Sequence, residues 1–334
     1  MRNFISEDDI EQAVLSKLKA APFKYDILIC DADPSKRDDL NDGTRRSSKK
    51  ECVLPDVMLS SLKHINPTIS EDKIKEIVKS LRQDYTGTDI VDTNYKTYRQ
   101  IRNNIKITVR RNGKEDFDFV KLIDFEHPEN NTFTAVSQMW IQGKVYYRRP
   151  DILIFINGMP LVFIELKNSI IKIEEAYNKN LKDYIRDIPN IFAFNQICVL
   201  SNGLETKLGA FNATYDYFFE WLKVDSEKEK LNREAVHSVE NAKDSSIRYF
   251  IDGLLNKERL IDYIENFILF ENQRIKIIAK NHQYLGVNNL MESVENRKEL
   301  NGKLGVFWHT QGSGKSYSMV MFARKVKRKV AGNF

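Results

Sequence analysis

The chain has 334 residues, of which 42% are hydrophobic and 30% charged, and its net charge at pH 7 is +5. This balance is typical of a globular protein with a full core, the length favours about two domains, and the small basic excess permits a polyanionic partner. The three cysteines show no C-x-x-C spacing, which argues against a zinc site or a disulfide framework. There is neither a signal-peptide core nor an apolar run of ~18–20 residues, so we expect a cytoplasmic protein without membrane contact.

The first third of the chain is predicted to be mainly helical. A capped amphipathic helix begins near Ser6, and Glu7 and Glu11 lie four residues apart on one of its faces. Either these carboxylates belong to a solvated first turn, or one of them reaches a metal bound by a neighbouring element. A strand at 24–33, an exposed polar loop at 34–50 and helices at 53–62 and 70–81 are expected to follow.

The middle of the chain is predicted to build a sheet. Strand-like segments occur at 104–110, 120–125 and 132–141. Two apolar runs at 152–156 and 161–166 flank Asn157-Gly158, a turn signal typical of a β-hairpin. A helix at 173–185, a buried strand at 196–201 and a core segment with Trp221 follow. The alternation of strands and helices around the hairpin predicts an α/β fold.

Three polar side chains mark one end of this hairpin. Asp151 precedes the first strand, and Glu165 and Lys167 end the second, with the spacing P-D-x13-E-x-K. Side chains two apart on a strand share a face, so Glu165 and Lys167 project together, near Asp151. Two carboxylates suit Mg²⁺, and a lysine beside them can orient water and stabilise charge on a phosphate, as phosphodiester hydrolysis needs. The alternative is that Asp151 caps a turn and the other two form a solvated ion pair.

The last hundred residues carry a second motif. A charged connection at 223–246 leads to predicted helical segments at 254–270 and 274–287. An apolar strand at 304–309, a glycine loop and a helix at 317–326 then follow in the order found in P-loop NTPases. Lys315 would reach the β- and γ-phosphates, and Ser316 would ligate Mg²⁺. The predicted ATP-binding residues of the loop are Thr310, Gly312, Ser313, Gly314, Lys315 and Ser316.

The glycine loop departs from the usual spelling, because His309 stands at its first glycine position, a form common in helicase-like motors. Only 18 residues follow Ser316. A RecA-like ATPase needs a further acidic strand end and usually an arginine from an opposing domain. We therefore expect this chain to hydrolyse no ATP by itself.

Joined in this order, RRPDILIFINGMPLVFIELKNS, AYNKNLKDY, NQICVLSNG, NHQYLGV and HTQGSGKS resemble the R subunit of type I restriction enzymes. The resemblance covers the whole chain. It implies a PD-(D/E)xK restriction-endonuclease-like core, a central mixed sheet flanked by helices, at residues 1–245. It also implies that residues 246–334 begin the first RecA-like lobe of a superfamily 2 helicase-type translocase.

The same resemblance assigns roles to single residues of the hairpin and the first helix. Asp151 and Glu165 become Mg²⁺ ligands, and Lys167 becomes the catalytic lysine. Glu11 matches an acidic family position on the first helix and is a further candidate for the metal site.

Two more positions take their meaning from the family. Asn180 stands where the family has the glutamine of a Q-x3-Y motif, and Tyr184 is retained, so the departure at Asn180 puts the motif's DNA-orienting role in doubt. Gln283 resembles the adenine-reading glutamine of helicase Q motifs. The alternative for Gln283 is a surface amide on a basic helix.

The resemblance finally implies an ATP-dependent type I site-specific deoxyribonuclease. Its partners would be double-stranded DNA and the methyltransferase and specificity subunits. Its cofactors would be Mg²⁺ and ATP, with S-adenosylmethionine entering only through the methyltransferase subunit. The complete enzyme would pull unmodified DNA past itself and cut it when translocation stalls. Two alternatives stay open: a stand-alone repair or recombination nuclease, and a DNA-binding assembly module with a vestigial site.

Overall fold

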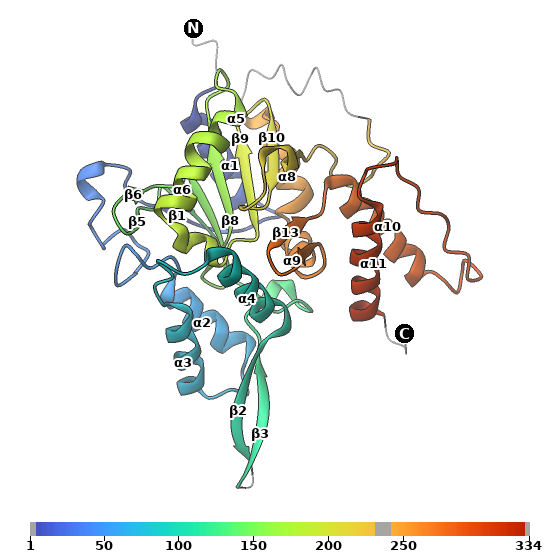
Figure 1. Cartoon of the computed structure of the whole chain (residues 1–334), viewed down its shortest axis with the longest axis horizontal. Coiled ribbons are helices and arrows are strands. Elements are labelled where there is room, and N and C mark those ends of the chain that lie inside the picture. The colour runs from blue at the N-terminus through green and yellow to red at the C-terminus, as the bar shows by residue number, and fades with distance from the viewer. Residues whose placement is uncertain (1–4, 112, 231–241, 331–334) are drawn as a thin grey trace.

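The computed structural model describes residues 5–111, 113–230 and 242–330, and a seven-stranded mixed sheet lies at its centre (Figure 1). β1 runs parallel to β4 and β8 runs parallel to β9, whereas the other neighbouring strands are antiparallel. In spatial order the strands are β1 (Asp26–Ile29), β4 (Phe133–Ser137), β7 (Ile152–Ile156), β8 (Met159–Leu166), β9 (Ile197–Ser201), β10 (Thr206–Gly209) and β11 (Phe219–Glu220).

The β7–β8 hairpin confirms the predicted strand pair, and all its residues are buried. Its turn places Asn157 at φ +50° and Gly158 at φ +78°. A side chain at Gly158 would put a Cβ 2.5 Å from the carbonyl oxygen of Leu54, at the start of a packed helix. The close approach and the positive φ together explain why glycine occupies this turn.

The two faces of the sheet are covered by different helices, which gives three layers. Ile152 and Ile154 share a core with α1 (Glu7–Lys19), α8 (Ile247–Leu254) and α9 (Lys257–Asn266). Leu153 and Phe155, which point the other way, share a core with the helical stretch after β8. That stretch consists of α5 (Ile173–Glu175), a π-helical segment (Ala176–Leu181) and α6 (Lys182–Asp187).

A second group of elements extends from one end of the sheet. It contains α2 (Pro55–Ile65), α3 (Glu71–Leu81) and α4 (Ile90–Asn103). The antiparallel ribbon of β2 (Ile105–Arg111) and β3 (Lys114–Val120) projects beyond them (Figure 1). Short helices of 3-10 type occur at Pro34–Lys36, Pro128–Asn130, Pro189–Ala193, Tyr215–Tyr217 and Ala242–Asp244.

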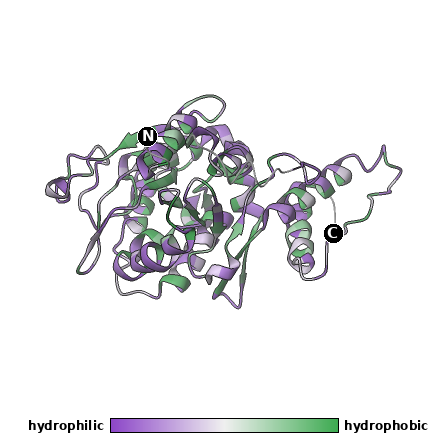
Figure 2. Ribbon diagram, turned by 90° about the horizontal axis from the view of Figure 1, so that it is seen from above, coloured by the Kyte–Doolittle hydropathy of each residue, from purple (hydrophilic) through white to green (hydrophobic). Residues whose placement is uncertain are grey.

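The last two helices, α10 (Asn281–Glu295) and α11 (Lys315–Lys329), stand to one side of the main body, as Figure 1 shows and Figure 2 shows from above. The ribbon of β12 (Ile268–Glu271) and β13 (Ile275–Ile278) lies against the main body beside α9. Trp221 is fully buried, as predicted, and its ring packs against those of Tyr263 and Tyr284. None of the helices in the described part of the chain has the length and apolar character needed to cross a bilayer.

One helix was missed, and several predicted elements are wrong or misplaced. The segment 90–103 is a helix that the sequence reading missed, capped by Asp89, which accepts hydrogen bonds from the backbone N–H of Val91 and Asp92. The strand expected at 120–125 ends at Val120, because β3 lies earlier. The helical segment predicted at 254–270 ends in β12, and the one predicted at 274–287 begins with β13, whose isoleucine-rich run favours a strand.

The predicted strand at 304–309 does not form. Val306 is 91% exposed and Trp308 is 76% exposed, and the run pairs with no strand in the described ranges. A strand forms only by hydrogen bonding to a neighbouring strand, so an apolar run without one stays irregular. Of the predicted charged connection at 223–246, residues 231–241 lie outside the described residues.

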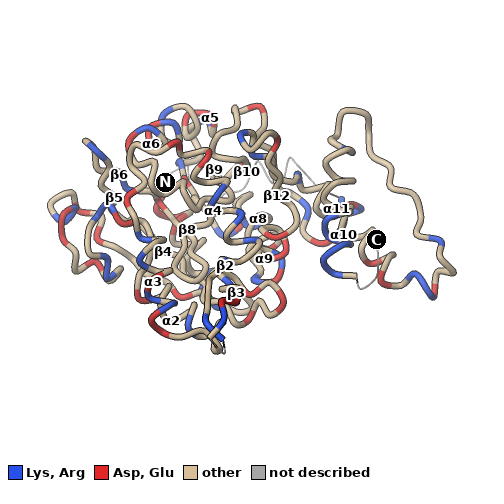
Figure 3. The backbone as a smooth tube through the Cα atoms, turned by 60° about the horizontal axis from the view of Figure 1, so that its bottom comes forward, with Lys and Arg blue, Asp and Glu red and all other residues tan. Residues whose placement is uncertain are grey.

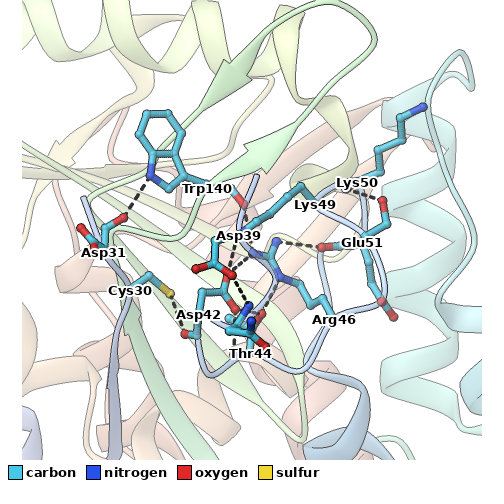
Figure 4. A network of polar contacts seen from close by, with 12 residues as sticks. Cys30, Asp31, Asp39, Asp42, Thr44, Arg46, Lys49, Lys50, Glu51 and Trp140 are labelled. Carbon is cyan, nitrogen blue, oxygen red and sulfur yellow. Dashed lines mark hydrogen bonds and ion pairs between the residues drawn. The ribbon is translucent and has the colours of Figure 1, made fainter. Parts of the chain in front are cut away.

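The loop at 34–50 is polar, as predicted, but part of it is buried. Asp42 accepts hydrogen bonds from Arg46 (2.9 Å) and Lys49 (2.7 Å), and all three side chains are almost fully enclosed (Figure 4). Arg46 also donates to the carbonyl oxygen of Trp140 at 3.0 Å. This network fixes the loop beside the segment that follows β4, because each buried charge has its partners there.

Candidate active site

The hairpin brings the three predicted polar residues to one edge of the sheet. Asp151 directly precedes β7, and its Oδ2 accepts a hydrogen bond of 2.7 Å from the backbone N–H of Leu166 on β8. Lys167 Nζ lies 3.2 Å from Glu165 Oε1, so these two side chains share a face. The antiparallel register of the hairpin therefore places Asp151, Glu165 and Lys167 together.

Burial dominates the electrostatics of this group. Glu165 is 1% exposed, and its Oε2 has no hydrogen-bond partner. Burial, followed by the nearby charge of Asp151, raises the pKa of Glu165 well above its usual range. Burial also raises the pKa of Asp151 to about 6. Burial alone would lower the pKa of Lys167, but the carboxylates of Glu165 and Asp151 outweigh it and raise that pKa.

The two carboxyls fit a divalent cation in their chemistry. An unpartnered buried carboxylate oxygen costs free energy unless a cation or a donor reaches it, and Glu165 Oε2 is such an atom. Among the described residues, no three His, Cys, Asp or Glu side chains converge as a ready metal cluster. Mg²⁺ keeps several waters and binds through one or two carboxylates together with substrate phosphate oxygens, so a pair of carboxyls such as Asp151 and Glu165 suits it.

The first helix adds a third carboxyl at the border of the site. Glu11 is 7% exposed, and it accepts hydrogen bonds from Ser137 Oγ and from Gln138 Nε2 at 2.5 Å. Burial raises its pKa in spite of these bonds. Glu7 lies 3.8 Å from Lys167 and is half-exposed. The solvated-turn alternative thus describes Glu7 but not Glu11, which is buried against the end of β4.

Backbone contacts hold this helix at the site. The N–H of Ser169 donates to the carbonyl oxygen of Ile5 at 3.1 Å, and the N–H of Ile5 donates to Ser169 Oγ at 3.0 Å. Ser6 and Asp9 then form a capping box that starts α1. The segment after Lys167 and the start of α1 are thereby joined two residues beyond the lysine.

Tyr184 lies near the same edge of the sheet, in the core on the face opposite to α1. Its hydroxyl donates to the carbonyl oxygen of Arg149 at 3.2 Å, and its ring packs edge-on against Phe163. Burial, with the charges of Glu165 and Asp151, raises the pKa of Tyr184, and Asn180 interacts with its hydroxyl. The π-helical segment that contains Asn180 is a rare form that occurs often at functional sites.

Of the predicted strand, glycine loop and helix, the loop and the helix form and the strand does not. Gly312 and Gly314 have φ of +79° and +85°, a conformation that glycine adopts without strain. Lys315 opens α11, and its Nζ donates to the carbonyl oxygens of His309 (2.9 Å) and Thr310 (3.1 Å). Ser316 follows in the first helical turn and is exposed. A helix start of this kind presents its first N–H groups to an anion, although the N–H of Tyr317 donates to the carbonyl oxygen of Gly314 here.

Gln283 is not a surface amide, so that alternative is wrong. It is 3% exposed, its Oε1 accepts from the backbone N–H of Lys280 at 2.8 Å, and its Nε2 donates to the carbonyl oxygen of Gly314 at 2.9 Å. A cavity of about 460 Å³ lies beside it. Among its lining residues are Gln283, Gly312, Ser313, Gly314 and Tyr317 from the motif, and Asn212 and Phe219 from the sheet side.

Sequence reading missed the residues that border the carboxylates from other segments. Ser137 and Gln138 donate hydrogen bonds to Glu11. The positive charge of Arg149, in the segment before Asp151, lowers the pKa of Glu11 and so opposes the effect of burial. Of these three residues, only Arg149 could have been suspected from the sequence, because it directly precedes Pro150-Asp151. Gln138 has φ +56°, which is uncommon for a residue other than glycine, but a backbone angle leaves no mark in one sequence.

The fold and the site define an α/β protein that joins a buried centre of two carboxyls and a lysine to a glycine-containing loop at the start of α11. Residues 4–217 match the model of the type I restriction enzyme R protein N terminus, and residues 282–333 match that of the SWI2/SNF2 ATPase. The chain belongs to the family of type I restriction enzyme R subunits.

Curated relatives agree with this membership. The type I restriction enzyme HindI endonuclease subunit of Haemophilus influenzae is 33% identical over 333 residues, which cover 96% of this chain and 30% of that one. The putative type I restriction enzyme MjaIXP endonuclease subunit of Methanocaldococcus jannaschii is 31% identical over 86% of this chain and 29% of its own length. The chain therefore spans about 30% of the length of these relatives.

Proposed function

We propose that this chain carries the DNA-cleaving centre of a type I restriction enzyme, as a PD-(D/E)xK endonuclease domain followed by the start of a RecA-like motor lobe. The observation that carries the proposal is the meeting of Asp151, Glu165 and Lys167 at one edge of the sheet. A buried carboxylate pair next to a lysine is suited to phosphodiester hydrolysis. Membership of the R-subunit family supports DNA as the substrate.

Each residue of the centre has a separate task in this proposal. Asp151 and Glu165 would hold Mg²⁺, which when bound polarises a phosphate oxygen and activates a water. Lys167 orients the attacking water and stabilises the negative charge that develops on the phosphate. Glu11, on α1, adds a further negative charge near Asp151 and contributes to the raised pKa of that carboxyl. Tyr184, with Asn180, fixes the backbone at Arg149, directly before the P-D pair.

The glycine loop would hold the phosphates of ATP in the complete subunit. Lys315 would leave the carbonyl oxygens of His309 and Thr310 to reach the β- and γ-phosphates, and Ser316 would share the nucleotide's Mg²⁺. Thr310, Gly312, Ser313 and Gly314 supply the backbone of the cradle. Gln283, whose Nε2 donates to the carbonyl oxygen of Gly314 in this structure, would recognise adenine.

In the cell the partners would be double-stranded DNA and the methyltransferase and specificity subunits of the same system. The motor would move unmodified DNA at the expense of ATP, and the nuclease would cut when movement stalls. S-adenosylmethionine would act only through the methyltransferase subunit. These parts of the proposal rest on the family, since the chain covers about 30% of its relatives' length.

The test compares two variants in the complete R subunit, assembled with its partner subunits. Lys167→Ala should lower the rate of plasmid cleavage at least about a hundredfold, because a group that stabilises the transition state is lost, while DNA-stimulated ATP hydrolysis continues. Lys172→Ala, an exposed lysine five residues away, is the matched control and should cut normally.

Three other results would contradict the proposal. Normal cleavage by the Lys167→Ala variant would show that the centre lies elsewhere. Efficient cutting by this chain without ATP or partner subunits would favour a stand-alone repair nuclease. DNA binding without any Mg²⁺-dependent cutting by the assembled wild-type enzyme would favour an assembly module with a vestigial site.

A further inference from the structure

A short hairpin stands directly before the nuclease residues and exposes apolar side chains. It is formed by β5 (Ile141–Gln142) and β6 (Tyr147–Arg148), and residues 143–146 form its tip. Val145 is 72% exposed and Tyr146 is 55% exposed, and Lys144 beside them is also exposed. Exposed apolar side chains gathered at one protruding tip, with cationic neighbours, are a feature of interaction sites.

The hairpin is held firmly at its base, although two strands of two residues would not be stable alone. The N–H of Gln142 donates to the carbonyl oxygen of Lys49 at 2.9 Å, which ties one strand to the buried ionic loop of Figure 4. On the other side, Arg148 pairs with Asp187 at 2.5 Å. Gly143 packs so tightly there that a Cβ would lie 1.7 Å from the carbonyl oxygen of Asp187. The tip is therefore presented to solvent on a fixed base.

The position of the tip along the chain places it within reach of any DNA at the centre. Tyr146 precedes Asp151 by five residues, so their Cα atoms lie no more than about 18 Å apart. The grooves of B-DNA are about 6 and 12 Å wide. A duplex with one phosphodiester against Asp151 and Glu165 therefore lies close enough for the hairpin tip to reach a neighbouring groove.

Cations next to the tip match the charge of such a ligand. In the part of the chain that the structure describes, neither Lys144 nor Arg149 forms an ion pair. The guanidinium of Arg149 lies over the ring of Trp140 and donates to the carbonyl oxygen of Ala32 at 2.6 Å, which leaves other N–H groups for an anion. Figure 3 shows basic residues beside β6. The phosphates that border a DNA groove would be suitable partners for these two cations.

We propose that the β5–β6 hairpin is a DNA-contacting finger that places Val145 and Tyr146 in the groove next to the scissile phosphate. Lys144 and Arg149 contact the flanking phosphates. Apolar side chains inserted in this way unstack a base step and bend the duplex toward the protein surface. This inference rests on the proposed nuclease function, and it names the surface that positions DNA on that centre.

The first test removes the apolar tip in the complete R subunit, assembled with its partner subunits. Val145→Ser combined with Tyr146→Ser should lower the cleavage rate about tenfold or more, because the groove contact is lost, while DNA-stimulated ATP hydrolysis keeps its wild-type rate. The matched control is Phe119→Ser, which changes a 58% exposed aromatic on the distant β2–β3 ribbon and should leave cleavage unchanged (Figure 1).

The second test asks what the tip touches. A benzophenone side chain placed at position 146 should crosslink to DNA in the stalled complex, and the same group at position 119 should not. Crosslinking of position 146 to the methyltransferase or specificity subunit would overturn the DNA assignment in favour of protein docking. Wild-type cleavage by the double variant would also overturn it. In either case loss of cutting by Lys167→Ala would still support the nuclease centre, so the two failures are distinguishable.

Discussion

Replacing Asp151 by asparagine should stabilise the metal-free protein while it removes cleavage. The carboxyl is buried next to Glu165, and burial raises its pKa from an ordinary 3.8 to about 6. Each step of 1 in pKa corresponds to 1.36 kcal/mol, so the ionised carboxylate costs about 3 kcal/mol of stability near pH 7. Asparagine keeps an oxygen that can accept the N–H of Leu166 and carries no charge.

The sign of the pH dependence follows from this shift. Between pH 4 and 6 the folded protein binds more protons at Asp151 than the unfolded chain does, so the stability of the wild type falls as pH rises through that window. Asp151→Asn removes that loss. The two proteins should unfold at similar temperatures near pH 4, whereas at pH 7 in EDTA the variant should unfold roughly 5 °C higher.

Calorimetry or circular dichroism at pH 4, 5, 6 and 7, with and without Mg²⁺, measures this directly. Mg²⁺ should raise the unfolding temperature of the wild type at pH 7, because a ligand that binds only the folded state stabilises it, and should have little effect on the variant. A variant that is less stable than the wild type at pH 7, or a difference that does not change with pH, would refute the reasoning. Glu165→Gln is the companion variant, with the same expected direction.

Three further outcomes follow from other parts of the molecule. Gly158→Ala should lower the free energy of unfolding in urea by about 3 kcal/mol, because its φ of +78° is strained for alanine and Leu54 blocks the Cβ; an unchanged midpoint would contradict the turn geometry. Lys315→Ala should abolish ATP binding and DNA-stimulated ATP hydrolysis by the complete subunit without altering the circular dichroism of this chain; retained hydrolysis would place the nucleotide elsewhere. Burial holds the pKa of Lys276 well below its usual range, so the stability of the wild type should rise between pH 7 and 10; thermal melts of Lys276→Met should lack this part of the rise.

The sequence predicted those parts of the fold that depend on local pattern. The β7–β8 hairpin carries two apolar runs and an Asn-Gly turn, and it forms as expected. The helix at Ile90–Asn103 was missed because its buried residues, Tyr98 and Ile101, lie in a stretch that leads directly into strands. The strand predicted at 304–309 is wrong for the opposite reason. The local pattern favours a strand, but a strand forms only next to a partner strand, which a local pattern does not contain.

The same distinction separates the predictable part of the site from the rest. Asp151, Glu165 and Lys167 lie within 17 residues of one another on one hairpin, so strand periodicity was enough to bring them together. The contacts of Glu11 with Ser137 and Gln138 join residues more than 120 positions apart. Nothing in the spacing of one sequence reports such a contact, and the burial of Glu11 depends on it.

A series of contacts also links the glycine loop to the edge of the sheet that carries Lys167. Gln283 connects the carbonyl oxygen of Gly314 to the start of α10, and β13 immediately precedes that helix. Lys276 on β13 is buried without a carboxylate, and its Nζ donates to Asn94, to the carbonyl oxygen of Asn195 and, at 3.0 Å, to the side chain of Gln196.

From Gln196 the chain enters β9, which ends at Ser201. The carbonyl oxygen of Ser201 accepts the backbone N–H of Lys167 at 2.8 Å. A shift of β13 therefore has to move β9, whose Ser201 accepts the backbone N–H of Lys167, or break the three hydrogen bonds that Lys276 Nζ donates. These contacts cross the predicted boundary between residues 245 and 246, because Lys276 on β13 is bonded to the segment that leads into β9.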